Sequence, residues 1–139
     1  MAELTYFMLY ESGQNIILPD GASVFQGLNP VMVLRPNFIP TNFSFACTFA
    51  IQNMDLQADY NIVILIKDSN DAEIARNESV IPKDYKSDSY LPKQYNGYIF
   101  NMNLHNVVFV KEDAYRFVIY LNGEFCGERI IPVYKKGEI

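Results

Sequence analysis

Apolar residues recur at every second position over several segments of this chain, which is the period of a β-strand. In Asn42–Gln52 all odd-numbered residues from 43 to 51 are apolar, and the residues between them are small or polar. The apolar side of this strand is predicted to face the core. The β-branched run Tyr60–Lys67 predicts a central strand, and Ala72–Val80, beyond the turn Asp68–Asp71, predicts its hairpin partner.

The last third of the chain predicts one strand followed by a hairpin. Tyr98–Val110 alternates between large apolar and polar side chains and is predicted to contain a bulge at Asn106. Ala114–Tyr120 and Phe125–Val133 are then joined by Asn122-Gly123, a dipeptide that strongly favours a tight hairpin turn. This part of the chain therefore indicates antiparallel β-structure.

The register of this terminal hairpin has two solutions. A two-residue loop places Phe117 opposite Glu128, whereas a three-residue loop with a bulge places Phe117 opposite Arg129. The second solution also pairs apolar residues with each other: Leu121 with Phe125 and Tyr115 with Ile131. We expect the second register, because it keeps more apolar side chains together.

Shorter apolar runs fill the first part of the chain. Leu4–Tyr10 predicts a buried strand, and Ser12–Asn15 predicts a turn. Ile16–Leu18 predicts a second short strand, which ends at the turn residues Pro19-Asp20-Gly21.

Prolines interrupt the segment that follows. Ser23–Leu34 contains Pro30, which excludes an uninterrupted central strand, so it is predicted to be either an edge strand or one strand broken at a bulge. Arg35–Pro40 is predicted to cross the end of the domain and to pack there through Phe38 and Ile39.

These patterns define the fold class. They predict eight or nine strands with no credible long helix, internal repeat or linker, so Met1–Ile139 is expected to be a single all-β domain. One-faced strands must bury their apolar sides against each other, which predicts a two-sheet antiparallel β-sandwich, Ig-like or jelly-roll-like. With 139 residues, half of them hydrophobic, the core needs no disulfide or metal to hold it.

The charge balance narrows the range of partners. The net charge is −5 with a pI near 4.7, and the basic residues are scattered, so nucleic-acid binding is not expected. No apolar run is long enough to span a membrane, and the N-terminus lacks the pattern of a signal peptide. The chain is therefore expected to be cytoplasmic, with Cys47 and Cys126 as buried thiols rather than a disulfide.

The sequence offers no constellation of catalytic or metal-binding residues. His105 is the single histidine, so it lacks histidine partners for a metal site and is predicted to be a surface side chain. Asp68–Asp71 lacks the spacing of a calcium loop and reads as a hairpin turn. No catalytic residue, metal or cofactor is therefore predicted, and the chain is not expected to be an enzyme.

The segment Pro82–Gly97 is the best functional candidate. It has no apolar period and is longer than most loops in compact domains, which favours a functional loop. Tyrosine offers a large contact area at low entropic cost, which suits a protein-binding surface. The alternative is a polar loop whose tyrosines fold back onto the sheet. The candidate partner-binding residues are Tyr85, Lys86, Asp88, Tyr90 and Tyr95.

Several segments together resemble an uncharacterised family of small bacterial and phage β-sandwich proteins of unknown function. They are Leu4–Tyr10, Val24–Leu28, Met102–Phe109, Asp113–Phe117 and Tyr120–Gly123. The resemblance implies a fold and no catalytic residues. Asp113-Ala114-Tyr115 also resembles the tyrosine corner of Ig-like sandwiches, in which a tyrosine hydroxyl bonds to nearby backbone.

The function predicted from these observations is a non-enzymatic protein-interaction module. Its partner would be an unidentified protein, or a second copy paired through an edge strand such as Ala72–Val80. If the chain is phage-borne, analogy with the resembling family favours a host-directed role that modulates defence, or an accessory virion role. The alternative is a β-sandwich that binds a small ligand or carbohydrate through aromatic residues, although the chain lacks tryptophan.

Overall fold

The computed structural model describes residues 1–55, 58–81 and 90–137. The strands are β1 Glu3–Ile17, β2 Ser23–Val31, β3 Thr41–Gln52, β4 Tyr60–Lys67, β5 Glu73–Ile81, β6 Gly97–Phe109, β7 Asp113–Leu121 and β8 Glu124–Val133. Within these ranges the single helical element is the 3₁₀ turn Lys93–Tyr95. No helix in the described part of the chain is long and apolar enough to cross a membrane.

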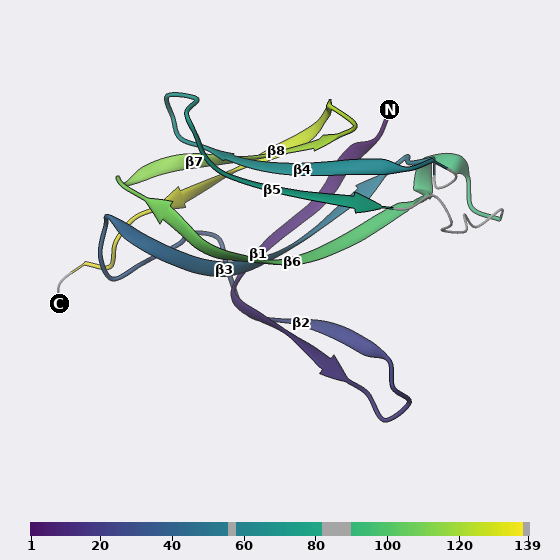
Figure 1. The fold of residues 1–139 in the computed structure, drawn as a ribbon, viewed down its shortest axis with the longest axis horizontal. Helices are drawn as coiled ribbons and strands as arrows, with labels where there is room; N and C mark the ends of the chain where they lie inside the picture. Colours follow the sequence, from purple (N-terminus) through teal and green to yellow (C-terminus); the bar gives the residue numbers. More distant parts are fainter. Residues whose placement is uncertain (56–57, 82–89, 138–139) are drawn as a thin grey trace.

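The eight strands form two four-stranded sheets that pack face to face (Figure 1). The first sheet has the strand order β2-β1-β3-β6, and the second has the order β5-β4-β7-β8. Every strand pairing within them is antiparallel. The predicted all-β, two-sheet antiparallel sandwich is confirmed, whereas the choice between an Ig-like and a jelly-roll-like topology stays a prediction.

The core lies between the two sheets and follows the predicted alternation. The residues that join the core cluster are Phe45, Cys47, Phe49 and Ile51 along β3, and Ile62, Ile64 and Ile66 along β4. The ring of Phe117 on β7 reaches across to the first sheet, where its centroid lies 5.8 Å from that of Phe7 and 5.9 Å from that of Phe45. Aromatic contacts of this kind therefore join the two layers.

The terminal hairpin has the expected register over most of its length. Phe117 pairs with Arg129 and Tyr115 pairs with Ile131, as the bulged solution requires. The register shifts between Ile119 and Tyr120, so that Leu121 pairs with Glu124 rather than with Phe125. The loop is thus the two-residue Asn122-Gly123, whose φ angles of 48° and 80° suit a tight turn. The bulge lies inside the strands and not in the loop.

Three further predictions about the second half of the chain are confirmed. The Asn106 bulge appears as a register shift opposite Phe43 and Phe45 and as a φ of 55° at Asn106. The tyrosine corner is present, because the Tyr115 hydroxyl donates a hydrogen bond of 2.6 Å to the carbonyl oxygen of Lys111. β5 is an edge strand of the second sheet, as expected.

The predicted turn at Ser12–Asn15 is wrong. β1 continues as one strand through these polar residues, because β2 pairs with it from Leu9↔Val31 to Ile17↔Ser23 and satisfies its backbone groups. Ile16–Leu18 is consequently no separate strand. β2 is an edge strand, which was one of the two alternatives predicted for Ser23–Leu34. Within it, Asn29 has a left-handed φ of 59° just before Pro30.

The connection from β2 to β3 packs through only one of the two residues expected, because Ile39 lies against the core and Phe38 does not. Leu34 and Pro36 are buried, whereas Phe38 is 75% exposed. The C-terminal residues run parallel to this connection: the Leu34 N–H donates to the Pro132 carbonyl (3.0 Å), and the Tyr134 N–H donates to the Leu34 carbonyl (3.1 Å). This backbone pairing orients the segment inward at Leu34 and leaves Phe38 outside the core.

Candidate functional site: an uncharged sheet and a projecting arm

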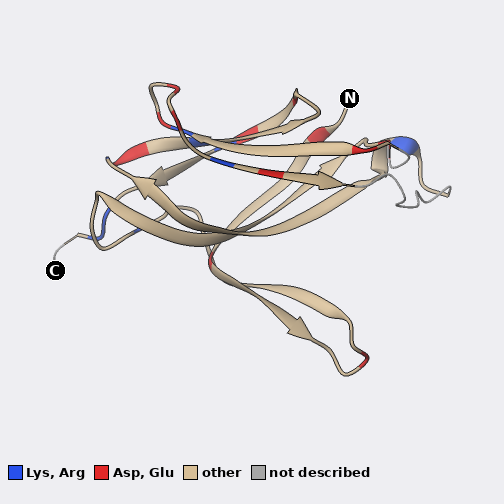
Figure 2. Cartoon of the chain, in the orientation of Figure 1, with Lys and Arg blue, Asp and Glu red and all other residues tan. Residues whose placement is uncertain are grey.

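The outward side of the first sheet carries no charged side chain in its central rows. Phe7, Phe49 and Phe100 form a row that faces the core. The row on each side of it therefore faces outward. One of these rows consists of Tyr6, Ala50 and Ile99, and the other consists of Met8, Thr48 and Asn101. Glu3 and Glu11 are the charged residues of these four fully described strands, and Figure 2 shows the rest of the sheet without charge.

The outward side of the second sheet is built differently. Arg76 pairs with Glu73 (3.0 Å) and Glu78 (2.8 Å) along β5. Arg116 on β7 contacts Asp71 and lies 3.4 Å from Glu128 on β8. Side chains of opposite charge thus form ion pairs on this sheet, where exposed apolar residues such as Phe125 (50%) and Ile130 (60%) lie between them.

The described end of the tyrosine-rich segment, from Tyr95 to Gly97, lies beside the uncharged sheet. Tyr85, Lys86 and Asp88 lie outside the described residues. Tyr90 is 95% exposed and Tyr95 is 54% exposed. Tyr95 also lines a groove of about 500 Å³ with Thr5, Ile99 and the start of β6. Tyr95 therefore adjoins the uncharged sheet and Tyr90 is open to solvent, and their role in binding stays a prediction.

Residues 12–28 form an arm that sequence reasoning missed. Beyond Tyr10, β1 pairs with β2 alone, and Figure 1 shows this two-stranded ribbon leading away from both sheets. Asp20, at the tip, is its single charged residue, and Ile17 (77% exposed) and Val24 (43% exposed) are open to solvent. The one available signal was Pro19-Asp20-Gly21 between two apolar segments, which is a hairpin signal of ordinary strength.

Aromatic rings stiffen the base of the arm. Gly13 and Gly27 are directly paired across the ribbon. The Phe25 ring lies over Gly13 and the Tyr10 ring lies over Gly27, so closely that a Cβ atom at either glycine would overlap the ring (2.4 and 2.5 Å). The two rings meet edge to face with centroids 6.5 Å apart. Rings that cover strand glycines in this way support a ribbon that has no third strand.

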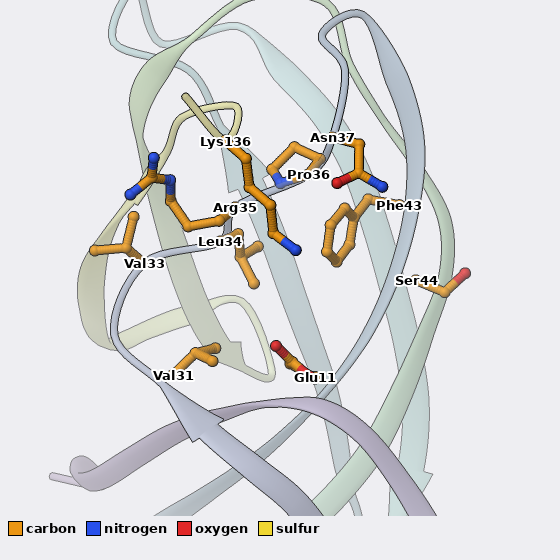
Figure 3. A pocket seen from close by; sticks show the side chains of 10 residues that line it. All are labelled: Glu11, Val31, Val33, Leu34, Arg35, Pro36, Asn37, Phe43, Ser44 and Lys136. Atoms are coloured by element: carbon orange, nitrogen blue, oxygen red, sulfur yellow. The ribbon is translucent and has the colours of Figure 1, made fainter. Parts of the chain in front are cut away.

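A cavity of about 320 Å³ lies where the arm joins the sandwich (Figure 3). Figure 3 shows the side chains of Glu11 and Lys136 pointing toward each other across it, with the Phe43 ring beside Lys136. Arg35 fixes the C-terminal wall, because its guanidinium donates to the carbonyl oxygens of Tyr134 (2.9 Å) and Lys135 (3.1 Å). The cavity thus presents one carboxylate, one ammonium group and one aromatic ring.

A second groove, of about 490 Å³, opens between β1 and β8. Its lining is apolar, and it includes Phe7, Leu9 and the exposed side chains of Met32 and Ile130. Arg129 is the one charged residue among the described residues that line it.

The residues weighed for catalysis do not form a reactive group. Cys47 is fully buried, and burial raises the pKa of its thiol to about 12. Burial also raises the pKa of Cys126, so neither cysteine offers a thiolate near neutral pH. His105 is exposed on β6, as predicted. Among the described residues, no three His, Cys, Asp or Glu side chains are grouped in a way that could hold a metal ion.

The acidic turn Asp68–Asp71 has a structural explanation, as predicted. The Asp68 carboxylate accepts hydrogen bonds from the N–H groups of Asn70 (2.8 Å) and Ala72 (3.0 Å). The Asp113 carboxylate accepts from the N–H groups of Ser69 (2.9 Å) and Ala114 (2.8 Å). The hydrogen bonds that Asp113 accepts, chiefly the one from Ser69, lower the pKa of Asp113 to about 2. Both carboxylates therefore hold the turn together.

Comparison with known proteins gives no family assignment. No family model matches the chain, and no curated protein matches it. Among solved structures, the chain is similar to part of a glycosyl hydrolase family 2 member from Bacteroides cellulosilyticus, with 15% sequence identity and a TM-score of 0.45. The match covers 73% of this chain and 13% of that one, and likeness at this level carries no argument about activity.

Proposed function

We propose that this protein is a non-enzymatic protein-binding β-sandwich. Its binding surface is the uncharged outward side of the first sheet together with Tyr90 and Tyr95. The carrying observation is the contrast in charge between the two sheets: one outward side carries several ion pairs, and the other has none in its central rows. Depletion of charge with enrichment of tyrosine is typical of the centre of a protein interface.

The exposure of individual side chains supports this surface. Ile99 is 68% exposed and Tyr6 is 45% exposed, and both lie in the row that passes through Ala50. Tyr95 borders the same groove as Ile99. The partner is an unidentified protein, and the bacterial or phage origin, with the host-directed or virion role, stays a prediction from the sequence resemblance.

The test is partner capture from a lysate of the organism that encodes the chain, followed by mass spectrometry. The double variant Tyr90→Ser/Tyr95→Ser and the single variant Ile99→Asp should each lose the captured protein and keep the wild-type melting temperature, because the three side chains are exposed. Arg76→Ala, on the charged sheet, is the matched control and should retain capture. Equal capture by all variants would exclude this surface, and a large fall in melting temperature of the tyrosine variant would mean that the tyrosines stabilise the fold.

A second candidate function is the binding of a small ligand, and the cavity in Figure 3 favours it. Its volume, about 320 Å³, lies at the lower end of the range of about 300–1,000 Å³ found for ligand pockets. Glu11 and Lys136 face one space, so a small molecule with separated positive and negative groups, or a sugar stacked on Phe43, fits its chemistry. Ligand-observed NMR with amino acids and monosaccharides tests it, with Glu11→Gln and Lys136→Met expected to abolish any saturation-transfer signal.

A further inference from the structure

β1 has a free strand edge next to the base of the arm. It pairs with β3 from Glu3 to Tyr10, but its pairing with β2 begins only at Leu9. Along Glu3–Met8 the other edge of β1 therefore has no strand partner among the described residues. A free edge with outward backbone N–H and C=O groups is a template for a strand from another chain.

The apolar groove between β1 and β8 runs beside this free edge. β8 is itself an edge strand of the second sheet, so the groove separates two strand edges. Met32 (81% exposed) and Ile130 (60% exposed) border it. A groove of this kind takes apolar side chains, and among the described residues that line it Arg129 offers the single charge that could orient them.

The arm has the complementary properties. Its β2 strand has a free outer edge, because β2 is the last strand of the first sheet. Its exposed apolar residues include Ile17, Leu18 and Val24, and its single charge is the acidic Asp20 at the tip. The arm and the groove therefore match in three respects. Each has a free strand edge, each has apolar side chains, and their single charges are opposite.

We propose that the arm of one copy docks in the β1–β8 groove of a second copy, with Asp20 close to Arg129. The chain's own arm does not fill this groove, because the ribbon leads away from both sheets (Figure 1). When each of two copies gives its arm to the other, the contacts are reciprocal and the assembly closes as a two-fold dimer. The groove borders the outward side of the first sheet at Met8, but Tyr90, Tyr95 and Ile99 do not line it, so variants at these three residues should leave the dimer intact.

Sedimentation velocity of the purified full chain tests the dimer, and reversal of the two charges tests its geometry. The wild-type protein should be measurably dimeric by the time its concentration reaches about 100 µM. Asp20→Arg and Arg129→Asp should each weaken the dimer at least about tenfold, because each places two like charges together twice per dimer. An equimolar mixture of the two variants should form a heterodimer, because each arm then meets a groove of opposite charge. The double variant Asp20→Arg/Arg129→Asp should likewise dimerise.

Three controls separate the proposed contact from general effects. Asp20→Asn removes the charge but keeps an acceptor for the Ala22 N–H, which now donates to Asp20 (2.9 Å), so it should weaken the dimer less than Asp20→Arg. Ile130→Ser should weaken it, whereas Val110→Ser, at a similarly exposed position (63%) outside the groove, should not. Circular dichroism confirms that each variant is folded. A wild type that stays monomeric, or a mixture of charge variants that does not associate, would overturn the proposal.

Discussion

The two sheets share one core, but their outward surfaces differ in charge. Phe117 of the second sheet packs against Phe7 and Phe45 of the first, so both layers draw on the same apolar contacts. On the outside, the second sheet holds ion pairs around Arg76 and Arg116, whereas the first sheet presents Tyr6, Met8, Thr48 and Ile99. The charged side needs no partner to cover it, because charged side chains remain hydrated in water. The uncharged side and its arm are the parts of the molecule for which we propose partners.

The largest expected effect is on the shared core. Phe117→Ala should reduce the free energy of unfolding by about 3–5 kcal/mol, because the ring is fully buried and its removal leaves a cavity between the sheets. Chemical denaturation measures the change. Phe125→Ala, at a ring that is 50% exposed on β8, is the control and should cost much less. A loss below about 1.5 kcal/mol for Phe117→Ala would mean that this ring does not join the two layers.

A smaller effect is expected where the first sheet depends on close backbone packing. A Cβ atom at Gly97 would lie 1.9 Å from the carbonyl oxygen of Ile51, at the point where β6 begins to pair with β3. Gly97→Ala should therefore cost about 1–3 kcal/mol, as overpacking typically does. Gly137→Ala has open space around its Cβ and should leave the free energy of unfolding unchanged. Equal stability of the two variants would show that the β3–β6 pairing adapts without loss.

The charged side should show a pH dependence through Asp113. Its pKa is lowered to about 2 by hydrogen bonds, chiefly that from Ser69, and an unfolded aspartate titrates near about 3.9. Its contribution to stability is therefore complete above the unfolded pKa and is lost as the pH falls through the folded pKa. Asp113→Asn should be less stable than wild type at pH 6, and the difference should shrink between about pH 4 and pH 2. Thermal melts of both proteins across this range measure it, and a constant difference would contradict the assignment.

The smallest effect is expected from the exposed ion pairs of the second sheet. Arg76→Ala removes contacts to Glu73 and Glu78, but all three side chains are about half exposed, and water screens such pairs. The melting temperature should fall slightly at low salt and match wild type at high salt. Differential scanning calorimetry at two salt concentrations measures this. A large, salt-independent loss would mean that the charged surface stabilises the fold directly, and the contrast between the sheets would then need another explanation.

Local patterns were enough to predict most strands. β3 and β6 follow their apolar alternation, and the β4–β5 hairpin lies where its turn residues place it. The Asn122-Gly123 turn was likewise predictable, because a left-handed backbone conformation is a property of the residues themselves. The tyrosine corner could be predicted from Asp113-Ala114-Tyr115, since its hydrogen bond joins residues only four positions apart.

Predictions failed where a distant partner overrides local preference. Ser12–Asn15 has the composition of a turn, but pairing with β2 keeps it in β1. Phe38 is apolar, but the parallel pairing of Leu34 with Val133 turns the segment so that Leu34 is buried instead. Leu121 pairs with Glu124 because the bulge of the hairpin lies further along the strands.

The candidate sites were even less accessible to sequence reasoning. The tyrosine segment was identified from its composition, and of its five named residues Tyr90 and Tyr95 lie in the described part of the chain, where both are exposed. The cavity in Figure 3 brings Glu11 and Lys136 together from opposite ends of the chain. The groove similarly combines Phe7 with Arg129 and Ile130.

The sequence by itself determined that this protein is an antiparallel β-sandwich with a large apolar core, because alternation and turn chemistry act over a few residues. The tertiary structure decided which strands share a sheet. It thereby gathered β1, β2, β3 and β6, whose charged residues are Glu3 and Glu11, into one layer and left residues 12–28 as an arm. The physical reason is that sheet order and the free edge of β1 arise from hydrogen bonds between distant segments, whose pairing no local pattern specifies.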